Sequence, residues 1–161
     1  MAEKLNVPAA FIHPPFFKDD SVKNQDETPF LAELLFLNGL CDKGPWQDPA
    51  NEVPDLFICW DKERQGIAVL FKKKRKQEAR AQMVKWTARY LQSLFWTNGL
   101  PVSGVSDLSA ALGNLGHKPV NAGERLGFIL ESPDHYHSFI QLTQLFDETK
   151  KLFYKKLALQ K

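Results

Sequence analysis

The chain has 161 residues and a formal net charge of +2, with 43% hydrophobic, 12% aromatic and 25% charged residues. This length and composition fit one domain with a substantial core, because there is enough apolar surface to offset the entropy lost on folding. The small net charge excludes strong attraction of the whole molecule to nucleic acid or to an anionic membrane, so any such attraction must come from local clusters.

No segment of the sequence is built to enter or cross a membrane. The N-terminal stretch lacks the apolar core of a signal peptide, and no uncharged apolar run reaches the roughly 18 residues of a spanning helix. Cys41 and Cys59 have apolar neighbours, which is typical of small buried residues, although a disulfide between them stays geometrically open. We therefore expect a cytoplasmic protein with no membrane partner.

The N-terminal residues 1–27 are rich in proline and in charge. This composition predicts an irregular arm in front of a single helical domain that comprises residues 28–161. The adjacent aromatic residues Phe16 and Phe17 follow two prolines, and we expect them to hold the arm against the domain.

The segment 28–39 has the features of a helix. Thr28 suits the N-cap, Pro29 suits the first helical position, and Gly39 suits the position just after the end. Because the segment is apolar on nearly all sides, we expect a central and well-buried helix.

Residues 56–71 contain two apolar runs separated by a charged connector that includes Gly66. The pattern fits either buried helical turns or a short β-hairpin. We favour a helix, because the other long segments are helical, and keep the hairpin as the alternative.

From about Arg75 to Thr97 the periodicity is helical, with one apolar stripe at spacings of three and four. The stripe consists of Ala79, Met83, Trp86, Tyr90 and Leu94.

Further helices are expected to begin at Ser106, at Asn121 and at Ser132. In the second of these, Glu124 stands at the spacing of a capping box. The last has an apolar stripe of its own, made of Phe139, Leu142, Phe146, Thr149, Phe153 and Leu157.

These elements together predict an all-α fold, a single compact bundle of about six or seven helices with an irregular N-terminal arm. Four tryptophans are expected in or at the edge of its core, because indoles in a small helical body usually serve packing. They are Trp46, Trp60, Trp86 and Trp96.

The most biased segment is a run of five cations from Lys72 to Lys76. If the helix that follows were extended backwards, several of these side chains would fall on or beside its apolar face, where burying an ammonium group is costly. We therefore expect either that the helix begins or bends near Arg75, or that its first turns project past the packed body. In both cases the cations are exposed at the helix end. The candidate contact residues are Lys72, Lys73, Lys74, Arg75, Lys76 and Arg80.

Three interpretations of this cluster compete. It is a solvated helix end, a contact for the phosphates of DNA or RNA, or a dock for an acidic protein. Residues 42–63 carry six acids and two lysines, so the two oppositely charged segments could also face each other. No zinc finger, basic zipper or RNA-binding aromatic signature is present.

No arrangement of residues indicates a cofactor, a metal or a catalytic centre. His135 and His137 are separated by one residue, so on a helix they point about 200° apart and cannot share a metal. His117 has no second ligand at metal-site spacing. The pair Glu124–Arg125 fits a helix cap and an ion pair better than a reacting pair.

Three stretches resemble the YpoC-like proteins, a family of uncharacterised bacterial proteins from Bacillus-type species: "LFWTNGLPV" (94–102), "KPVNAGERLGFIL" (118–130) and "YHSFIQLTQLFDETKK" (136–151). The resemblance covers about the last 70 residues. It implies a cytosolic helical protein and transfers no catalytic residues.

We therefore expect a non-enzymatic accessory factor that acts through a protein partner, with nucleic-acid binding through residues 72–80 as the alternative. No pattern in the sequence identifies the partner or an oligomeric state.

Overall fold

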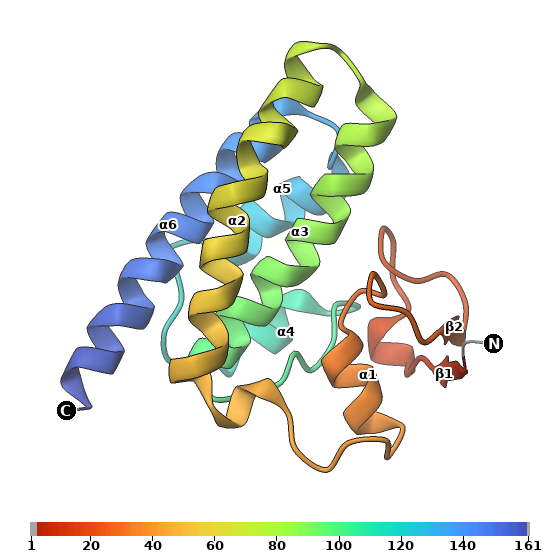
Figure 1. The fold of residues 1–161 in the computed structure, drawn as a ribbon, viewed down its shortest axis with the longest axis vertical. Coiled ribbons are helices and arrows are strands. Elements are labelled where there is room, and N and C mark those ends of the chain that lie inside the picture. The colour runs from red at the N-terminus through yellow and green to blue at the C-terminus, as the bar shows by residue number, and fades with distance from the viewer. Residues whose placement is uncertain (1–2, 161) are drawn as a thin grey trace.

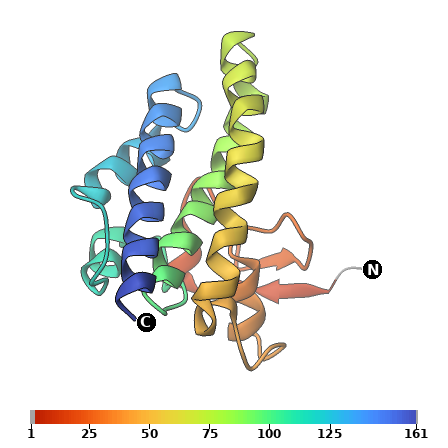
Figure 2. The same ribbon diagram turned by 60° about the vertical axis from the view of Figure 1, so that its left-hand side comes forward.

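The computed structural model describes residues 3–160 and is dominated by three long helices. Helices α2 (Pro49–Lys72) and α3 (Lys76–Thr97) form an antiparallel hairpin, and α6 (Tyr136–Leu159) packs against both. The turn between α2 and α3 projects beyond the rest of the molecule in both ribbon views (Figures 1 and 2). The predicted all-α architecture is confirmed.

The remaining elements are short and surround this three-helix body. They are β1 (Lys4–Asn6), η1 (Ala9–Phe11), β2 (Ser21–Lys23), α1 (Leu31–Leu37), η2 (Pro45–Gln47), α4 (Leu108–Gly113) and α5 (Ala122–Glu131). The two strands pair antiparallel in one small sheet, and α5 packs on α6 and α3.

The core forms where the stripe of α3 meets the stripe of α6. Met83, Trp86 and Tyr90 are fully buried, and the Trp60 ring stacks on Phe146 with centroids 4.5 Å apart. All four tryptophans are buried, and both predicted stripes face inward. Periodic burial of large apolar side chains thus accounts for the long helices, as the spacing predicted.

Residues 56–71 are helical and lie within α2, so the preferred prediction is confirmed and the hairpin alternative is wrong. Gly66 lies within the helix on its solvent side, and nothing lies within 4 Å of the position that a β-carbon would occupy there. Pro54 lies in the second turn of the helix, where it has no N–H to donate to the carbonyl four residues earlier.

The N-terminal arm is more ordered than its composition indicated. Leu5 and Phe11 enter the core, and the strands β1 and β2 pair over three residues each. Phe17 is buried, and the Phe16 ring packs edge-on against Phe30 at 5.0 Å, so the expected anchoring of the arm is confirmed.

The expectation of a central helix at residues 28–39 is wrong. Helix α1 begins only at Leu31, and the Thr28 hydroxyl donates to the Lys23 carbonyl instead of capping it. Leu37 is 53% exposed, because this seven-residue helix lies at the edge of the molecule beside β1. A short peripheral helix cannot bury apolar side chains on every side.

Two other helix starts differ from the predicted caps, and a third matches in position. Helix α4 follows Asp107, whose carboxylate accepts from the Ala110 amide, so Ser106 is not the cap. Asn121 precedes α5 as expected, but it has a positive φ and makes no side-chain cap. Helix α6 begins at Tyr136, four residues after Ser132.

The two cysteines are exposed and free, so the prediction of two buried cysteines is wrong. Cys59 lies on the solvent side of α2, and Cys41 lies in the loop after α1. Apolar neighbours in sequence do not show burial at either site, because adjacent residues on a helix point to different sides and Cys41 lies in an exposed loop.

Candidate polyanion interface at the α2–α3 turn

The cations Lys72–Lys76, here called the basic turn, end α2 and begin α3. The Arg75 amide donates to the Leu70 carbonyl at 2.9 Å, and the Lys74 amide donates to the Phe71 carbonyl at 3.1 Å. This pair of bonds is the Schellman motif, which satisfies the last carbonyls of a helix. The cluster is therefore held in a defined turn.

Lys74 occupies the left-handed position of this motif, with φ +59°. The same motif ends α1 and α3, where the equivalent residues are Gly39 and Gly99, each with φ +73°. A side chain in the left-handed region costs about 1–2 kcal/mol, and glycine avoids this cost. The basic turn therefore carries a lysine where the other two helix ends carry glycine.

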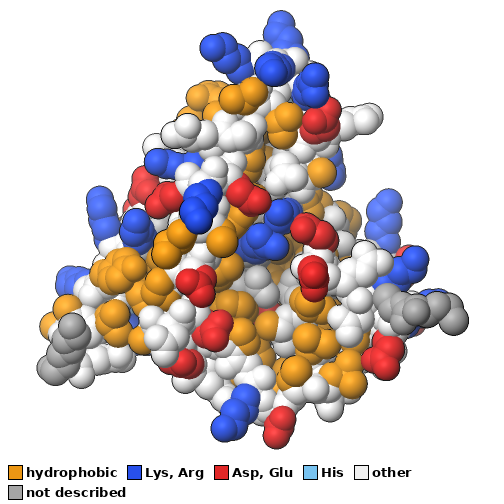
Figure 3. Space-filling model, viewed as in Figure 1, with side chains coloured by type: hydrophobic (Ala, Val, Ile, Leu, Met, Phe, Trp, Pro, Cys, Tyr) orange, Lys and Arg blue, Asp and Glu red, His pale blue; other side chains and the backbone are white. Residues whose placement is uncertain are grey.

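All five cations of the basic turn are exposed. Arg75 lies 3.5 Å from Glu78, and both side chains are more than half exposed. Within residues 3–160 no other carboxylate is within ion-pair distance of the turn. Lysine and arginine side chains gather over this end of the molecule, with hydrophobic side chains directly below them (Figure 3).

The preceding acidic segment pairs elsewhere. Glu63 lies 3.6 Å from Lys85, and Asp61 lies 3.6 Å from Lys150. These two acidic residues thus meet cations further along the bundle, and within residues 3–160 the basic turn has only the exposed Arg75–Glu78 pair. The expected exposure of the cluster at a helix end is confirmed.

A cleft of about 540 Å³ lies between the basic turn and the start of α6. We call it the aromatic cleft. Its lining residues are Phe71, Lys74, Arg75, Lys76, Asp134, His135, Tyr136 and His137. Cations from one end of the α2–α3 hairpin are thereby placed next to aromatic and imidazole rings from the start of α6.

The rings of Phe71 and Tyr136 meet at one side of the aromatic cleft. Their centroids are 5.8 Å apart and their planes cross at 74°. Phe139, which is only 6% exposed, packs against both rings from the core side. Tyr136 is 56% exposed, so much of this side chain remains accessible to a ligand.

Sequence analysis did not find the aromatic side of this cleft. Phe71 and Tyr136 are far apart in the chain, and only the packing of α6 on α2 brings them together. The available signal was weak: Tyr136 stands three residues before Phe139 and so continues the apolar stripe, which by spacing alone indicates a core residue.

Arg80 lies one turn after Lys76 and is exposed. It lines a different cleft of about 560 Å³, together with His13, Asp107 and Glu131. Arg80 is therefore separate from the aromatic cleft, although it lies only one helical turn after Lys76, which lines that cleft.

The most deeply buried charged group is Glu33, which is 1% exposed. Its carboxylate accepts from Gln92 Nε2 at 2.9 Å, from Trp96 Nε1 at 2.8 Å and from the Val102 amide at 3.0 Å. We call this arrangement the Glu33 junction. Desolvation raises the pKa of Glu33, and the three donors oppose that rise.

The Glu33 junction has a structural role. It joins α1 to the last turns of α3 and to the loop after α3, and all its contacts are internal. Sequence analysis missed it, because a single glutamate in an apolar helix gives no indication of its partners.

Arg125 also has an internal partner. Its guanidinium donates two bonds to the Glu148 carboxylate and one to Gln141, which ties α5 to α6. These hydrogen bonds to Glu148 raise the pKa of Arg125. The expected ion pair at Arg125 is thus present, with Glu148 as its partner, while Glu124 is exposed.

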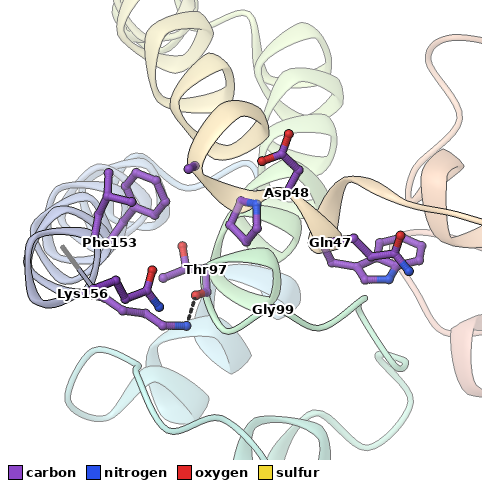
Figure 4. Close-up of a pocket in the computed structure, with 11 residues that line it drawn as sticks. Gln47, Asp48, Thr97, Gly99, Phe153 and Lys156 are labelled. Atoms are coloured by element: carbon purple, nitrogen blue, oxygen red, sulfur yellow. Dashed lines mark hydrogen bonds between the residues drawn. The ribbon is translucent and has the colours of Figure 1, made fainter.

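Another cavity, of about 450 Å³, lies near the ends of α3 and α6 (Figure 4). Its charged residues are Asp48 and Lys156, and Lys156 Nζ donates to the Thr97 carbonyl at 2.8 Å. That carbonyl is one of the unpaired acceptors at the end of α3. Lys156 therefore serves to cap a helix.

Within the described part of the chain, no group of three or more histidine, cysteine, aspartate or glutamate side chains is arranged to hold a metal ion. None of the helices in residues 3–160 is long and apolar enough to cross a membrane.

The fold and these surfaces define a small helical protein with a projecting basic turn. The chain belongs to the YpoC-like protein family, whose family model matches residues 50–161. It is 37% identical over 117 residues to "Uncharacterized protein YpoC" of Bacillus subtilis (strain 168), which covers 73% of this chain and 71% of that protein. No solved structure matches.

The resemblance noted in the sequence is confirmed, and it reaches further towards the N-terminus than the motifs indicated. The family match begins at residue 50 and so includes nearly all of α2 as well as the basic turn.

Proposed function

We propose that this protein is a non-enzymatic accessory factor that binds nucleic acid through the basic turn. The observation that carries the proposal is the set of five exposed cations on a projecting turn, nearly free of internal carboxylate partners. Cations in such a position release counterions when they meet a phosphate backbone, and this release drives salt-dependent binding.

The strain at Lys74 supports the same proposal. Glycine would suit its positive φ better, as at Gly39 and Gly99, so a lysine there reduces the stability of the turn. Residues in costly backbone conformations often lie where a ligand is bound. A phosphate contact made by Lys74 explains why a lysine occupies this position despite its backbone strain.

No helix or strand beside the basic turn is shaped to read base pairs, since the cations lie on a tight turn and not along a helix that fits a groove. Contacts to phosphate position a protein but carry no sequence information. The proposed binding is therefore independent of sequence.

An acidic protein partner is the second candidate. Val69 is 45% exposed beside the basic turn, and Tyr136 is exposed on the neighbouring helix. Exposed apolar side chains next to cations suit an acidic surface with an apolar centre. This candidate predicts that the protein does not bind nucleic acid at low salt but captures an acidic partner through the same turn.

The test is fluorescence anisotropy with labelled DNA at low and at physiological salt. The variant Lys73→Gln/Lys74→Gln/Lys76→Gln should bind more weakly, and its salt slope should fall by about one for each lysine that contacts a phosphate. A matched control, Lys62→Gln/Lys151→Gln/Lys155→Gln, removes the same charge from exposed positions away from the turn.

The control variant should bind like the unchanged protein apart from a small general loss. Absence of binding to any DNA at low salt would refute the proposal. Equal losses in the two triple variants would refute the assignment to the basic turn, because net charge alone would then explain the binding.

A further inference from the structure

We infer that the aromatic cleft receives an unpaired base, so that the basic turn binds single-stranded nucleic acid in preference to duplex. The inference rests on the proposed nucleic-acid binding and adds the form of the ligand. Its main observation is that accessible aromatic rings and three cations of the basic turn line the same cleft.

The lining of the cleft suits a base, and its volume is large enough to admit one. Its volume of about 540 Å³ lies within the range of roughly 300–1,000 Å³ that is typical of ligand pockets. Tyr136 offers an exposed aromatic side chain, and Phe71 stands at 74° to it as a second wall. Bases stack on such rings with little regard to their identity, because every base has an aromatic face.

Neighbouring rings restrict the position of the Tyr136 ring before any ligand binds. Tyr136 begins a 24-residue helix, and its ring contacts both Phe71 and the buried Phe139. A ring that is held by its neighbours loses little conformational freedom when a base stacks on it.

The charges of the cleft favour a nucleotide over a bare phosphate. Lys74, Arg75 and Lys76 come from the basic turn, whereas Asp134 comes from the opposite side beside Tyr136. A carboxylate there disfavours a phosphate on the α6 side but can accept a hydrogen bond from an N–H group of a base. The phosphates that flank a bound base are therefore expected on the side of the turn.

A duplex cannot place a base in the aromatic cleft. Its bases are stacked on one another and paired, so only its phosphates reach the protein, and the contacts reduce to those of the basic turn. A single strand adds the stacked base to the same phosphate contacts. The preference for single strands thus depends on the aromatic cleft, and the general affinity depends on the cations.

The test compares Tyr136→Ala with the matched control Tyr154→Ala, which removes a 44% exposed tyrosine further along the same helix. The probes are oligothymidine, a duplex of equal length, and an oligothymidine with abasic positions. Tyr136→Ala should weaken oligothymidine binding about tenfold and leave duplex binding unchanged, since stacking of one base contributes about that factor. Tyr136→Phe should retain the affinity.

The abasic strand should bind the unchanged protein as weakly as intact oligothymidine binds Tyr136→Ala, and combining both changes should add no further loss. Tyr136→Ala could bind oligothymidine as well as the unchanged protein while the triple lysine variant still loses binding. That result would overturn the binding of a base in the aromatic cleft and leave the proposed function intact. An equal loss on duplex and single strand would also overturn it. Binding of neither probe by the unchanged protein would refute both proposals.

Discussion

The Glu33 junction and the basic turn differ in the exposure of their ionisable side chains and in the internal partners of those side chains. Glu33 is 1% exposed and accepts three hydrogen bonds, so its carboxyl oxygens are fully engaged inside the fold. The five cations of the basic turn are exposed, and the ion pair they make within residues 3–160 joins the exposed side chains of Arg75 and Glu78.

This difference separates stability from binding. A buried carboxylate that accepts from three donors holds the elements around it together. Loss of the carboxylate leaves its donors unsatisfied, and loss of a donor leaves a carboxylate oxygen unsatisfied. Exposed and unpaired cations add little to stability, because water already solvates them. Changes at Glu33 should therefore alter folding, and changes in the basic turn should alter binding.

The largest effect is expected for Glu33→Ala. It leaves Gln92, Trp96 and Val102 with buried donors that have no acceptor, at about 1 kcal/mol or more each, so the free energy of unfolding should fall by roughly 2–4 kcal/mol. Denaturant unfolding followed by tryptophan fluorescence measures it. The exposed Asp42→Ala serves as the control and should change stability little. An equal loss in both variants would contradict the role of the junction.

The next effect concerns pH. Because burial raises the pKa of Glu33 above 4.5, the folded protein holds this proton more tightly than the unfolded chain does. Its contribution to stability is greatest below the ordinary glutamate pKa and is lost as pH rises through the raised value. Glu33→Gln, which cannot titrate, should therefore gain stability relative to the unchanged protein as pH rises through that window.

Unfolding curves for the two proteins across the acid-to-neutral range give this difference directly. A relative loss of stability in Glu33→Gln as pH rises would show that the three donors outweigh desolvation. The Glu33 junction would then stabilise the charged form.

A smaller effect, of opposite sign, is expected at Lys74. Lys74→Gly removes the strain of the positive φ but adds chain entropy to the unfolded state, so the free energy of unfolding should rise by about 0.5–1 kcal/mol. Lys74→Gln keeps the strain and should leave stability unchanged. Both variants should weaken DNA binding to a similar degree. A stability loss in Lys74→Gly would show that the lysine side chain stabilises the turn.

The smallest effect on folding is expected for the triple change Lys73→Gln/Lys74→Gln/Lys76→Gln. These side chains are exposed and lack carboxylate partners within residues 3–160, so the free energy of unfolding should change by no more than about 0.5 kcal/mol. The same denaturation measurement applies. A large loss of unfolding free energy would show that the basic turn stabilises the fold, as the Glu33 junction does.

Periodicity in the sequence was enough to predict the long helices. The stripes of α3 and α6 depend only on local spacing, and Lys72–Lys76 could be assigned to a helix end because cations do not enter a core. Residues 56–71 were assigned to a helix by analogy with the rest of the chain, and the structure agrees.

Tertiary structure decided the features that depend on contacts between distant segments. Glu33 meets its donors about 60 residues later in the chain, and Phe71 meets Tyr136 only because α6 packs along α2. The exposure of α1 and of both cysteines was decided in the same way. Local sequence sets which side of a helix is apolar, but only the packed chain determines what that side meets.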